Sequence, residues 1–263
     1  MEYKHLGSTC LLIPEIGLGT WAYTEGALPL RRGIEMGACL IDTAESYGTE
    51  AIVGDAIRGI RDQVIVATKV SQNHFRKGDV IRSADQSLRR LGINHIDLYQ
   101  LHSPNPHIPI EETMGAMEFL VDAGKVRFIG VSNFSVIQLK QAQSALSKGR
   151  IASNQVKYSL VARDIEDSLL PYCQENQITV IAYSPLAEGI SNIFRRDSAG
   201  VIERIAAETG KTTAQLALNW CIHKEAVIAI PKANSVAHIE EDCGASGWSL
   251  SVDHIELLNR TFK

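Results

Sequence analysis

Short apolar runs alternate with longer amphipathic segments along most of the chain. Continuous apolar runs bounded by turn residues are typical of strands that are buried in a parallel sheet. The pattern predicts eight strands, at 15–21, 39–42, 64–69, 96–102, 126–131, 151–155, 179–183 and 227–230. It predicts helices at 28–37, 49–60, 79–91, 110–123, 135–147, 164–176, 201–209, 213–223, 236–243 and 252–262.

The alternation of strands and helices predicts the fold class. Eight βα units in a chain of this length match an α/β protein of the (β/α)8 TIM-barrel type, formed as a single domain over residues 1–263. Residues 3–7 and 10–14 predict an N-terminal β-hairpin that caps one end of the barrel. A doubly wound open sheet is the alternative. It is less favoured because no G-x-G-x-x-G fingerprint follows a strand.

Composition excludes several classes of protein. The net charge is only -4, with acidic and basic residues mixed along the chain, which argues against a nucleic-acid-binding surface. No N-terminal run resembles a signal peptide, and no apolar stretch approaches the roughly 20 residues of a membrane helix. We therefore expect a cytoplasmic protein with no membrane partner. The five cysteines lack a C-x-x-C or zinc-type spacing, so reduced thiols and no metal site are expected.

Polar residues end three successive predicted strands. Asp42, Lys69 and His102 occupy these positions, and Tyr47 follows the first of them. The C-terminal ends of barrel strands converge on one opening, so these side chains are expected to share a site. A buried carboxylate needs a partner, and Lys69 is the candidate partner of Asp42. Taken singly, each residue also has a structural explanation, such as an isolated ion pair.

Tyr47 suits acid–base chemistry if its environment changes its pKa. An unperturbed phenol has a pKa near 10, and an adjacent ammonium is expected to lower the pKa of Tyr47 by favouring the phenolate. Asp42 would hold Lys69 charged and in place, and His102 would orient a substrate oxygen. The set suits donation of a proton to a carbonyl group that receives a hydride.

Eight short motifs occur in order along nearly the whole chain. They are Gly17-Leu18-Gly19-Thr20-Trp21, Asp42-Thr43-Ala44 through Tyr47-Gly48, Ala67-Thr68-Lys69, Leu101-His102, Gly130-Val131-Ser132-Asn133-Phe134, Asn154-Gln155, Ala182-Tyr183-Ser184-Pro185-Leu186 and Ile230-Pro231-Lys232. Together they resemble the aldo-keto reductase superfamily. The resemblance implies a (β/α)8 barrel and NAD(P)-dependent reduction of small aldehydes or ketones, without a metal.

The resemblance also implies roles for individual residues. Asp42, Tyr47, Lys69 and His102 would form a catalytic tetrad in which Tyr47 is the general acid. Trp21 would form a wall of the substrate pocket, together with Tyr47 and His102. The expected cofactor-binding residues are Ser132, Asn133 and Gln155 at the nicotinamide carboxamide, Tyr183 against its ring, and Ser184, Leu186, Lys232, Asn234, Ser235, His238, Glu241 and Asp242 around the pyrophosphate and adenosine.

The chain departs from the family pattern in two places. NADPH-preferring members often carry arginine at the position of His238 and Ser or Thr at that of Ala233. Lys232 remains available for a 2′-phosphate, so NADPH is the expected cofactor and NADH is the alternative. The loops, including the one after Tyr183, are short, which predicts an open pocket and broad specificity.

Two other functions are alternatives to carbonyl reduction. Some relatives of this fold bind NADPH and act as regulatory subunits with little turnover. A Schiff-base aldolase with Lys69 as nucleophile would need a neutral lysine, which Asp42 opposes. The expectation is a reductase that acts on a small-molecule carbonyl substrate, as a monomer or a weak homo-oligomer.

Overall fold

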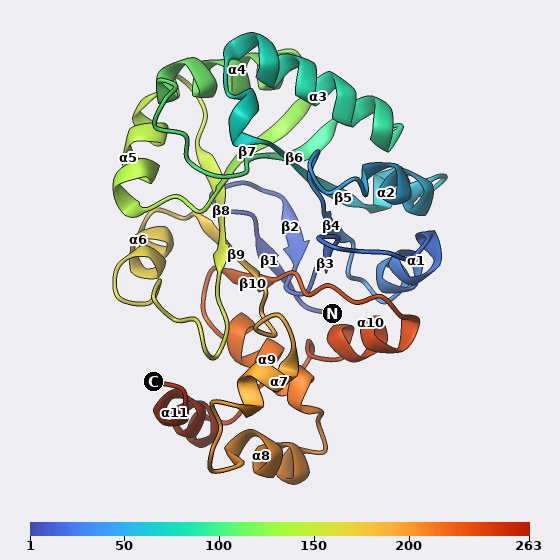
Figure 1. The fold of residues 1–263 in the computed structure, drawn as a ribbon, viewed down its shortest axis with the longest axis vertical. Helices are drawn as coiled ribbons and strands as arrows, with labels where there is room; N and C mark the ends of the chain where they lie inside the picture. Colours follow the sequence, from blue (N-terminus) through green and yellow to red (C-terminus); the bar gives the residue numbers. More distant parts are fainter.

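Eight parallel strands form the central sheet, and neighbours in the sheet are neighbours in the sequence. The computed structural model describes residues 1–263. The strands are β3 (Leu18–Gly19), β4 (Leu40–Asp42), β5 (Ile65–Val70), β6 (Ile96–Leu101), β7 (Val126–Ser132), β8 (Ile151–Lys157), β9 (Thr179–Tyr183) and β10 (Val227–Ala229). Figure 1 shows them curving around a common centre inside a ring of helices.

Contacts between the first and last strands close the sheet into a barrel. Ile16 forms a parallel bridge with Ala229. The backbone N–H of Gly17 donates to the Ala229 carbonyl at 2.8 Å, and that of Gly19 donates to the Pro231 carbonyl at 2.9 Å. A Cβ atom on Gly19 would lie 2.7 Å from the Ile230 carbonyl oxygen, so glycine permits this close approach. The predicted barrel is confirmed, although the first strand is shorter than the expected 15–21.

The N-terminal hairpin closes one end of the barrel, as predicted. Its strands, β1 (Tyr3–His5) and β2 (Leu12–Pro14), pair antiparallel and cross the centre of the view in Figure 1. Leu6 and Ile13 join the apolar cluster inside the barrel. The Gly7 N–H donates to Thr179 Oγ1 at 2.7 Å, which ties the hairpin to the start of β9.

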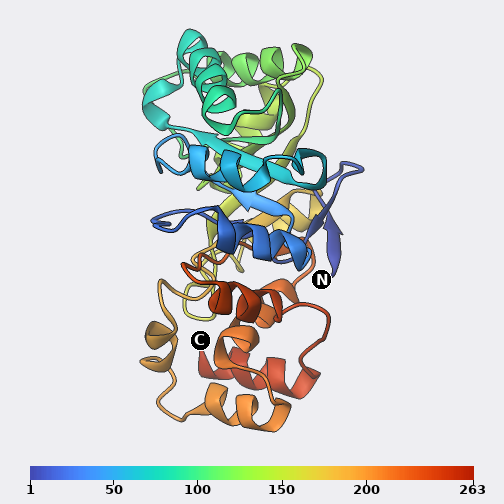
Figure 2. The same ribbon diagram turned by 90° about the vertical axis from the view of Figure 1, so that its right-hand side faces the viewer.

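Helices surround the barrel, and a group of C-terminal helices extends it at one end. They are α1 (Ala27–Glu35), α2 (Glu50–Ile57), α3 (Lys77–Leu91), α4 (Ile110–Asp122), α5 (Val136–Ser144), α6 (Leu169–Glu175), α7 (Ile190–Phe194), α8 (Val201–Thr209), α9 (Thr213–Ile222), α10 (Val236–Cys243) and α11 (Val252–Thr261), with 3-10 turns η1 (Arg61–Gln63) and η2 (Gln72–His74). Figures 1 and 2 place α8 and α11 at the opposite end of the molecule from α3 and α4. None of the helices is both long and apolar enough to cross a membrane.

Local side chains define where several helices begin. Ser135 and Thr212 form capping boxes at α5 and α9, in which each hydroxyl accepts from the N–H three residues later. The helix predicted at 164–176 begins only at Leu169, because the residues before it form turns. The short helix α7 was not predicted, since five residues carry too little periodicity to reveal a helix.

Alternate strand residues face either the barrel interior or the helices. Ile65 and Ala67 of β5 belong to the inner apolar cluster, whereas Val66 and Val70 belong to the larger cluster beneath the helices. At the C-terminal ends of the strands, polar residues replace apolar ones on the inner face. The fold therefore gathers the predicted site residues at the end opposite the hairpin.

Candidate active site

A cavity of about 660 Å³ opens at the C-terminal ends of the strands. The predicted residues that line it are Trp21, Asp42, Tyr47, His102, Ser132, Asn133, Gln155, Tyr183, Ser184, Leu186 and Lys232. Lys69 lies beneath this surface and is fully buried. Trp21 is 62% exposed at the cavity, so it is not an ordinary core residue.

Lys69 and Asp42 form a buried ion pair below the cavity. Lys69 Nζ donates to Asp42 Oδ2 at 2.5 Å, to the Thr43 carbonyl at 3.1 Å and to Tyr47 Oη at 3.3 Å. An ammonium group has three hydrogens, so each has an acceptor. Burial lowers the pKa of Lys69, and the Asp42 carboxylate opposes this effect. A lysine buried among three acceptors is unsuited to attack a substrate, which disfavours the aldolase alternative.

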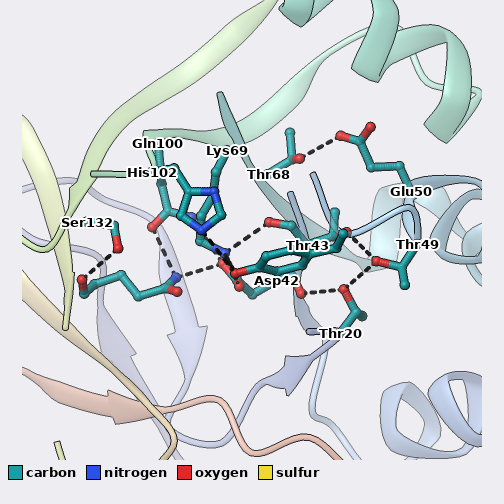
Figure 3. Close-up of polar contacts among 12 residues, drawn as sticks. Thr20, Asp42, Thr43, Thr49, Glu50, Thr68, Lys69, Gln100, His102 and Ser132 are labelled. Carbon is teal, nitrogen blue, oxygen red and sulfur yellow. Dashed lines mark hydrogen bonds and ion pairs between the residues drawn. The ribbon is translucent and has the colours of Figure 1, made fainter. Parts of the chain in front are cut away.

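Threonine hydroxyls hold the end of β4 in position. Thr20 Oγ1 donates to the Asp42 carbonyl at 3.0 Å and lies 2.9 Å from Thr49 Oγ1. The Thr43 and Thr49 hydroxyls are also 2.9 Å apart. Figure 3 shows these threonines on the side of Asp42 away from Gln100 and Ser132. All three are buried, so the network orders the backbone on both sides of the carboxylate.

The loop after β4 carries Tyr47 over the ion pair. Tyr47 Oη accepts from Lys69 and lies 3.4 Å from His102 Nε2, with the two rings in an edge contact. Because Lys69 occupies a lone pair of the phenol, the phenolic hydrogen is free to point toward His102 or into the cavity. Tyr47, Lys69 and His102 thus converge as predicted.

The expected lowering of the Tyr47 pKa is wrong in its net direction. Burial raises the pKa of the Tyr47 phenol well above its usual value, and the Asp42 and Tyr183 charges raise it further. The carboxylate that neutralises Lys69 also repels a phenolate, and the phenol is largely removed from water. Tyr47 therefore stays protonated at neutral pH, which is the form that a proton donor needs.

His102 follows β6 and faces the phenol. Burial lowers the pKa of His102, and the nearby Lys69 charge lowers it further. The ring is therefore neutral at pH 7 and offers one nitrogen as donor and the other as acceptor. A neutral imidazole beside Tyr47 can donate a hydrogen bond to a carbonyl oxygen and leaves the transfer of a proton to Tyr47.

Glu45 is a supporting residue two positions before Tyr47 in the loop after β4. Its side chain is only 7% exposed. Glu45 Oε1 accepts from the Ser71 N–H at 2.6 Å and lies 2.9 Å from His74 Nδ1. These contacts join the loop that carries Tyr47 to the end of β5, which carries Lys69. The acidic side chain thus holds the loop of Tyr47 against the end of β5.

Four predicted residues meet on the other wall of the cavity. Tyr183 Oη donates to Asn133 Oδ1 at 3.1 Å, and Ser132 Oγ donates to the Gln155 carbonyl at 2.9 Å. Asn133 has a φ of 62°, an uncommon conformation that directs its side chain across the strand ends. The wall presents an aromatic ring beside amide groups, a chemistry that suits a flat ring bearing a carboxamide.

The residues expected around the adenosine lie at α10. Lys232 lines the cavity, and Ser235 caps α10 by accepting from the His238 N–H at 3.2 Å. His238 is exposed and Glu241 is half-buried. Asn234 has a buried Oδ1 atom without a hydrogen-bond partner. Asn234, Ser235, His238, Glu241 and Asp242 do not line the cavity itself.

Several lining residues were not anticipated. They are Gly19, Thr20, Ser46, Ser103, Pro185, Glu188, Gly189, Ile230 and Pro231. Gly19, Thr20, Pro185, Ile230 and Pro231 belong to the motifs quoted above, and Ser46 and Ser103 adjoin a predicted residue in the sequence. Gln100, which hydrogen-bonds to Asp42 at 3.1 Å, was also missed. The signal for it was a polar residue two positions before His102, which places it on the same face of the strand as His102. No group of His, Cys, Asp and Glu side chains is arranged to hold a metal ion.

Asp242 is expected to make stability depend on pH. Burial, and then the Glu241 charge, raise the pKa of Asp242 from 3.8 to about 7. The unfolded carboxyl ionises near its ordinary pKa, so stability falls as pH rises from about 4 to about 7. This rise in pKa corresponds to roughly 4 kcal/mol of unfolding free energy at most. Asp242→Asn should remove the decline and raise the melting temperature at pH 8.

Thermal unfolding between pH 4.5 and 8, without ligand, measures this effect. Asp62→Asn is the control because Asp62 is exposed in η1. Equal pH dependence in wild type and Asp242→Asn would contradict the assignment.

Comparison with known proteins gives the family. A family model described as the aldo/keto reductase family matches residues 15–261. Methylglyoxal reductase YeaE of Escherichia coli (strain K12) is 37% identical over 262 residues, which cover 95% of this chain and 91% of YeaE. Aldo-keto reductase YhdN of Bacillus subtilis (strain 168) is 33% identical over 310 residues, which cover 98% of this chain and 93% of YhdN.

Solved structures agree with this match. The thermostable aldo-keto reductase Tm1743, in complex with the inhibitor epalrestat, has a TM-score of 0.92 and 41% identity, covering 99% of this chain and 100% of that one. An aldo-keto reductase from Klebsiella pneumoniae in complex with NADPH has a TM-score of 0.90 and 39% identity, covering 100% of this chain and 96% of that one. A barrel with a Tyr–Lys–Asp–His cluster at its mouth defines the class. The chain belongs to the aldo/keto reductase family.

Proposed function

We propose that this chain, acting as a single domain of residues 1–263, reduces small aldehydes or ketones to alcohols with NADPH. The observation that carries the proposal is the position of Tyr47 Oη, 3.3 Å from Lys69 Nζ and 3.4 Å from His102 Nε2 at the cavity. This arrangement places a protonated acid beside a hydrogen-bonding imidazole, which is what a carbonyl oxygen requires as it becomes an alcohol.

The proton chemistry follows from these contacts. His102 holds the carbonyl oxygen within reach of Tyr47, and Tyr47 donates its proton to that oxygen. The resulting phenolate keeps its contact with the Lys69 ammonium, which stabilises the negative charge. Asp42 fixes Lys69 in place through a 2.5 Å contact. NADPH, when bound, supplies the hydride to the carbonyl carbon.

The residues around the cavity fit this cofactor. Ser132, Asn133 and Gln155 offer hydroxyl and amide groups for the carboxamide, and Tyr183 offers an aromatic face for the ring. Ser184 and Leu186 would contact the pyrophosphate. Lys232 is the only lysine or arginine that lines the cavity. The capped start of α10 lies three residues after it and favours a phosphate group.

The remaining adenosine contacts are proposed on α10 and just before it. They would come from Asn234, Ser235, His238, Glu241 and Asp242. The unpaired Oδ1 of Asn234 is the structural support for a polar ligand there.

Removal of the Lys232 charge should weaken the binding of NADPH but not the binding of NADH. If Lys232 pairs with the 2′-phosphate, Lys232→Met should weaken NADPH binding by about tenfold to a hundredfold, since hydrogen bonds to charged groups contribute about 1.5–3 kcal/mol. NADH lacks that phosphate, so its affinity should stay unchanged. Calorimetric titration of both cofactors measures the effect. Lys140→Met, on the exposed face of α5, is the control, and equal losses for both cofactors would contradict the role.

The substrate is proposed to be a small carbonyl compound admitted from an open side. Trp21 forms one wall of the cavity. Ser46, which precedes Tyr47 in the sequence, and Ser103, which follows His102, also line it with polar side chains. YeaE is named a methylglyoxal reductase, which supports including small dicarbonyls among the candidates. We further propose a cytoplasmic protein, monomeric or weakly associated, that binds neither nucleic acid nor membranes.

Oxidation of NADPH and of NADH, measured side by side with aldehydes, dicarbonyls and aldoses, tests the proposed function. Turnover that is lost in Tyr47→Phe is the expected result. Cofactor binding without turnover over the whole panel would overturn the proposal and favour a regulatory NADPH-binding subunit.

A further inference from the structure

Gln100 is a fully buried amide in the interior of the barrel. It lies on β6 between Leu98 and His102, and by the alternation of strand residues all three side chains face inward. Leu98 belongs to the inner apolar cluster. An amide in this position costs free energy unless it is hydrogen-bonded, so its contacts indicate why it is there.

The orientation of the Gln100 amide is fixed by its neighbours. Its Nε2 atom lies 3.1 Å from Asp42 Oδ1, and its Oε1 atom lies 3.3 Å from Gln155 Nε2. An ionised carboxylate only accepts hydrogen bonds, so the atom facing Asp42 must be the amide nitrogen. The amide oxygen therefore faces Gln155.

The contact with the Asp42 carboxylate also fixes the orientation of the Gln155 amide. Its Nε2 atom donates to Asp42 Oδ1 at 2.8 Å and to Gln100 Oε1 at 3.3 Å, which uses both amide hydrogens. The Gln155 Oε1 atom has no donor within the protein, and Gln155 lines the cavity. Gln155 therefore presents an acceptor, rather than a donor, to a ligand.

Space for this arrangement is provided by Gly130 on the adjacent strand β7. Gly130 pairs with Gln100 in the sheet register. A Cβ atom at Gly130 would lie 2.9 Å from Gln100 Cγ and 2.6 Å from Ser153 Oγ. The missing side chain lets the Gln100 amide fit within the inner layer of the barrel.

We propose that Gln100 is a positioning residue that, together with Asp42, sets the donor and acceptor orientation of the Gln155 amide by accepting from Gln155 Nε2. In this orientation Gln155 accepts a hydrogen bond from the NH2 group of the nicotinamide carboxamide. The inference deepens the proposed function and rests on it. Gln100 also holds Oδ1 of Asp42, which leaves Oδ2 to pair with Lys69. One buried amide thus couples the cofactor contact to the ion pair beneath Tyr47.

Binding titrations with Gln100→Met test this role. Methionine matches the length of glutamine but has neither donor nor acceptor, so NADPH affinity should fall by about tenfold, on the scale of one to two hydrogen bonds. The probe 2′,5′-ADP carries the adenosine end without nicotinamide, so its affinity should stay unchanged. Tyr99→Phe is the matched control, because Tyr99 is next to Gln100 on β6 but belongs to the larger cluster beneath the helices. Its buried hydroxyl has no hydrogen-bond partner, so its removal breaks no contact.

Two results would overturn the proposal. Unchanged NADPH affinity in Gln100→Met would show that Gln155 needs no such support. A parallel loss of NADPH and 2′,5′-ADP affinity would indicate general structural damage. Because binding is measured, a wild-type chain that binds NADPH but reduces no carbonyl would refute the proposed function and leave this test intact.

Gln100→Glu gives a second, independent readout. The introduced carboxyl can donate to Asp42 only while it is protonated, so NADPH affinity should be near normal at acid pH. It should fall as pH rises and the new carboxylate faces Asp42. Wild type and Gln100→Met should not show this added pH dependence. Its absence from Gln100→Glu would mean that donation to Asp42 is not what Gln100 contributes.

Discussion

Tyr47→Phe is expected to lower kcat for carbonyl reduction by about 10²- to 10⁴-fold, the usual contribution of a general acid. The phenol is the group that can place a proton on the substrate oxygen, because His102 is neutral and Lys69 is fully buried. Phenylalanine keeps the ring and its edge contact with His102 but removes the proton. Steady-state NADPH oxidation with the best substrate of the panel measures the change.

A measurement of cofactor affinity shows whether the loss of kcat in Tyr47→Phe comes from the chemical step or from weaker NADPH binding. Tyr47→Phe should bind NADPH as wild type does, since the proposed cofactor contacts come from other residues. Tyr23→Phe is a suitable control, because Tyr23 is a buried tyrosine whose hydroxyl donates to the Gly26 carbonyl at 2.8 Å. If Tyr47→Phe retained wild-type kcat, the assignment of the general acid would be wrong.

Lys69→Met is expected to reduce both activity and stability. Its removal leaves the buried Asp42 carboxylate with only the two glutamine amides as partners, and breaking a buried pair costs about 3–5 kcal/mol. The Tyr47 phenolate that forms in the reaction would also lose its stabilising cation. Denaturant unfolding and steady-state kinetics, measured on the same preparation, give the two effects.

A double variant distinguishes the two effects. In Lys69→Met with Asp42→Asn, the buried charge is gone, while the new amide oxygen can still accept from Gln100 and Gln155. Most of the lost stability should return, but activity should not. Recovery of activity in the double variant would show that Lys69 acts only by neutralising Asp42. Wild-type stability in Lys69→Met alone would contradict the importance of the pair.

Strand ends and helix faces were predicted well because their signals are local. Asp42, Lys69 and His102 each end an apolar run, and barrel topology brings such ends together. The helix predicted at 164–176 has a wrong start, because turns precede Leu169. The short α7 gave no periodic signal, because tertiary contacts rather than propensity decide a single turn of helix.

The direction in which the pKa of Tyr47 is shifted depends on how deeply the folded protein buries the phenol. The sequence placed a cation near the phenol, but the size of the desolvation and the position of Asp42 are properties of the folded site. The Glu45 contacts to Ser71 and His74 likewise join residues that are far apart in the sequence. Gln100 and Gln155 are separated by 55 positions, yet their amides lie 3.3 Å apart.

By itself, the sequence determined the βα alternation, the barrel and the identity of the polar groups at the strand ends, because hydrophobic period and strand order act through near neighbours. The tertiary structure decided which atoms of those groups face each other. It directed Lys69 to three acceptors, kept the Tyr47 proton on the phenol and oriented the Gln155 amide. These outcomes depend on burial and on hydrogen-bond geometry between strands, and both arise only when the barrel closes.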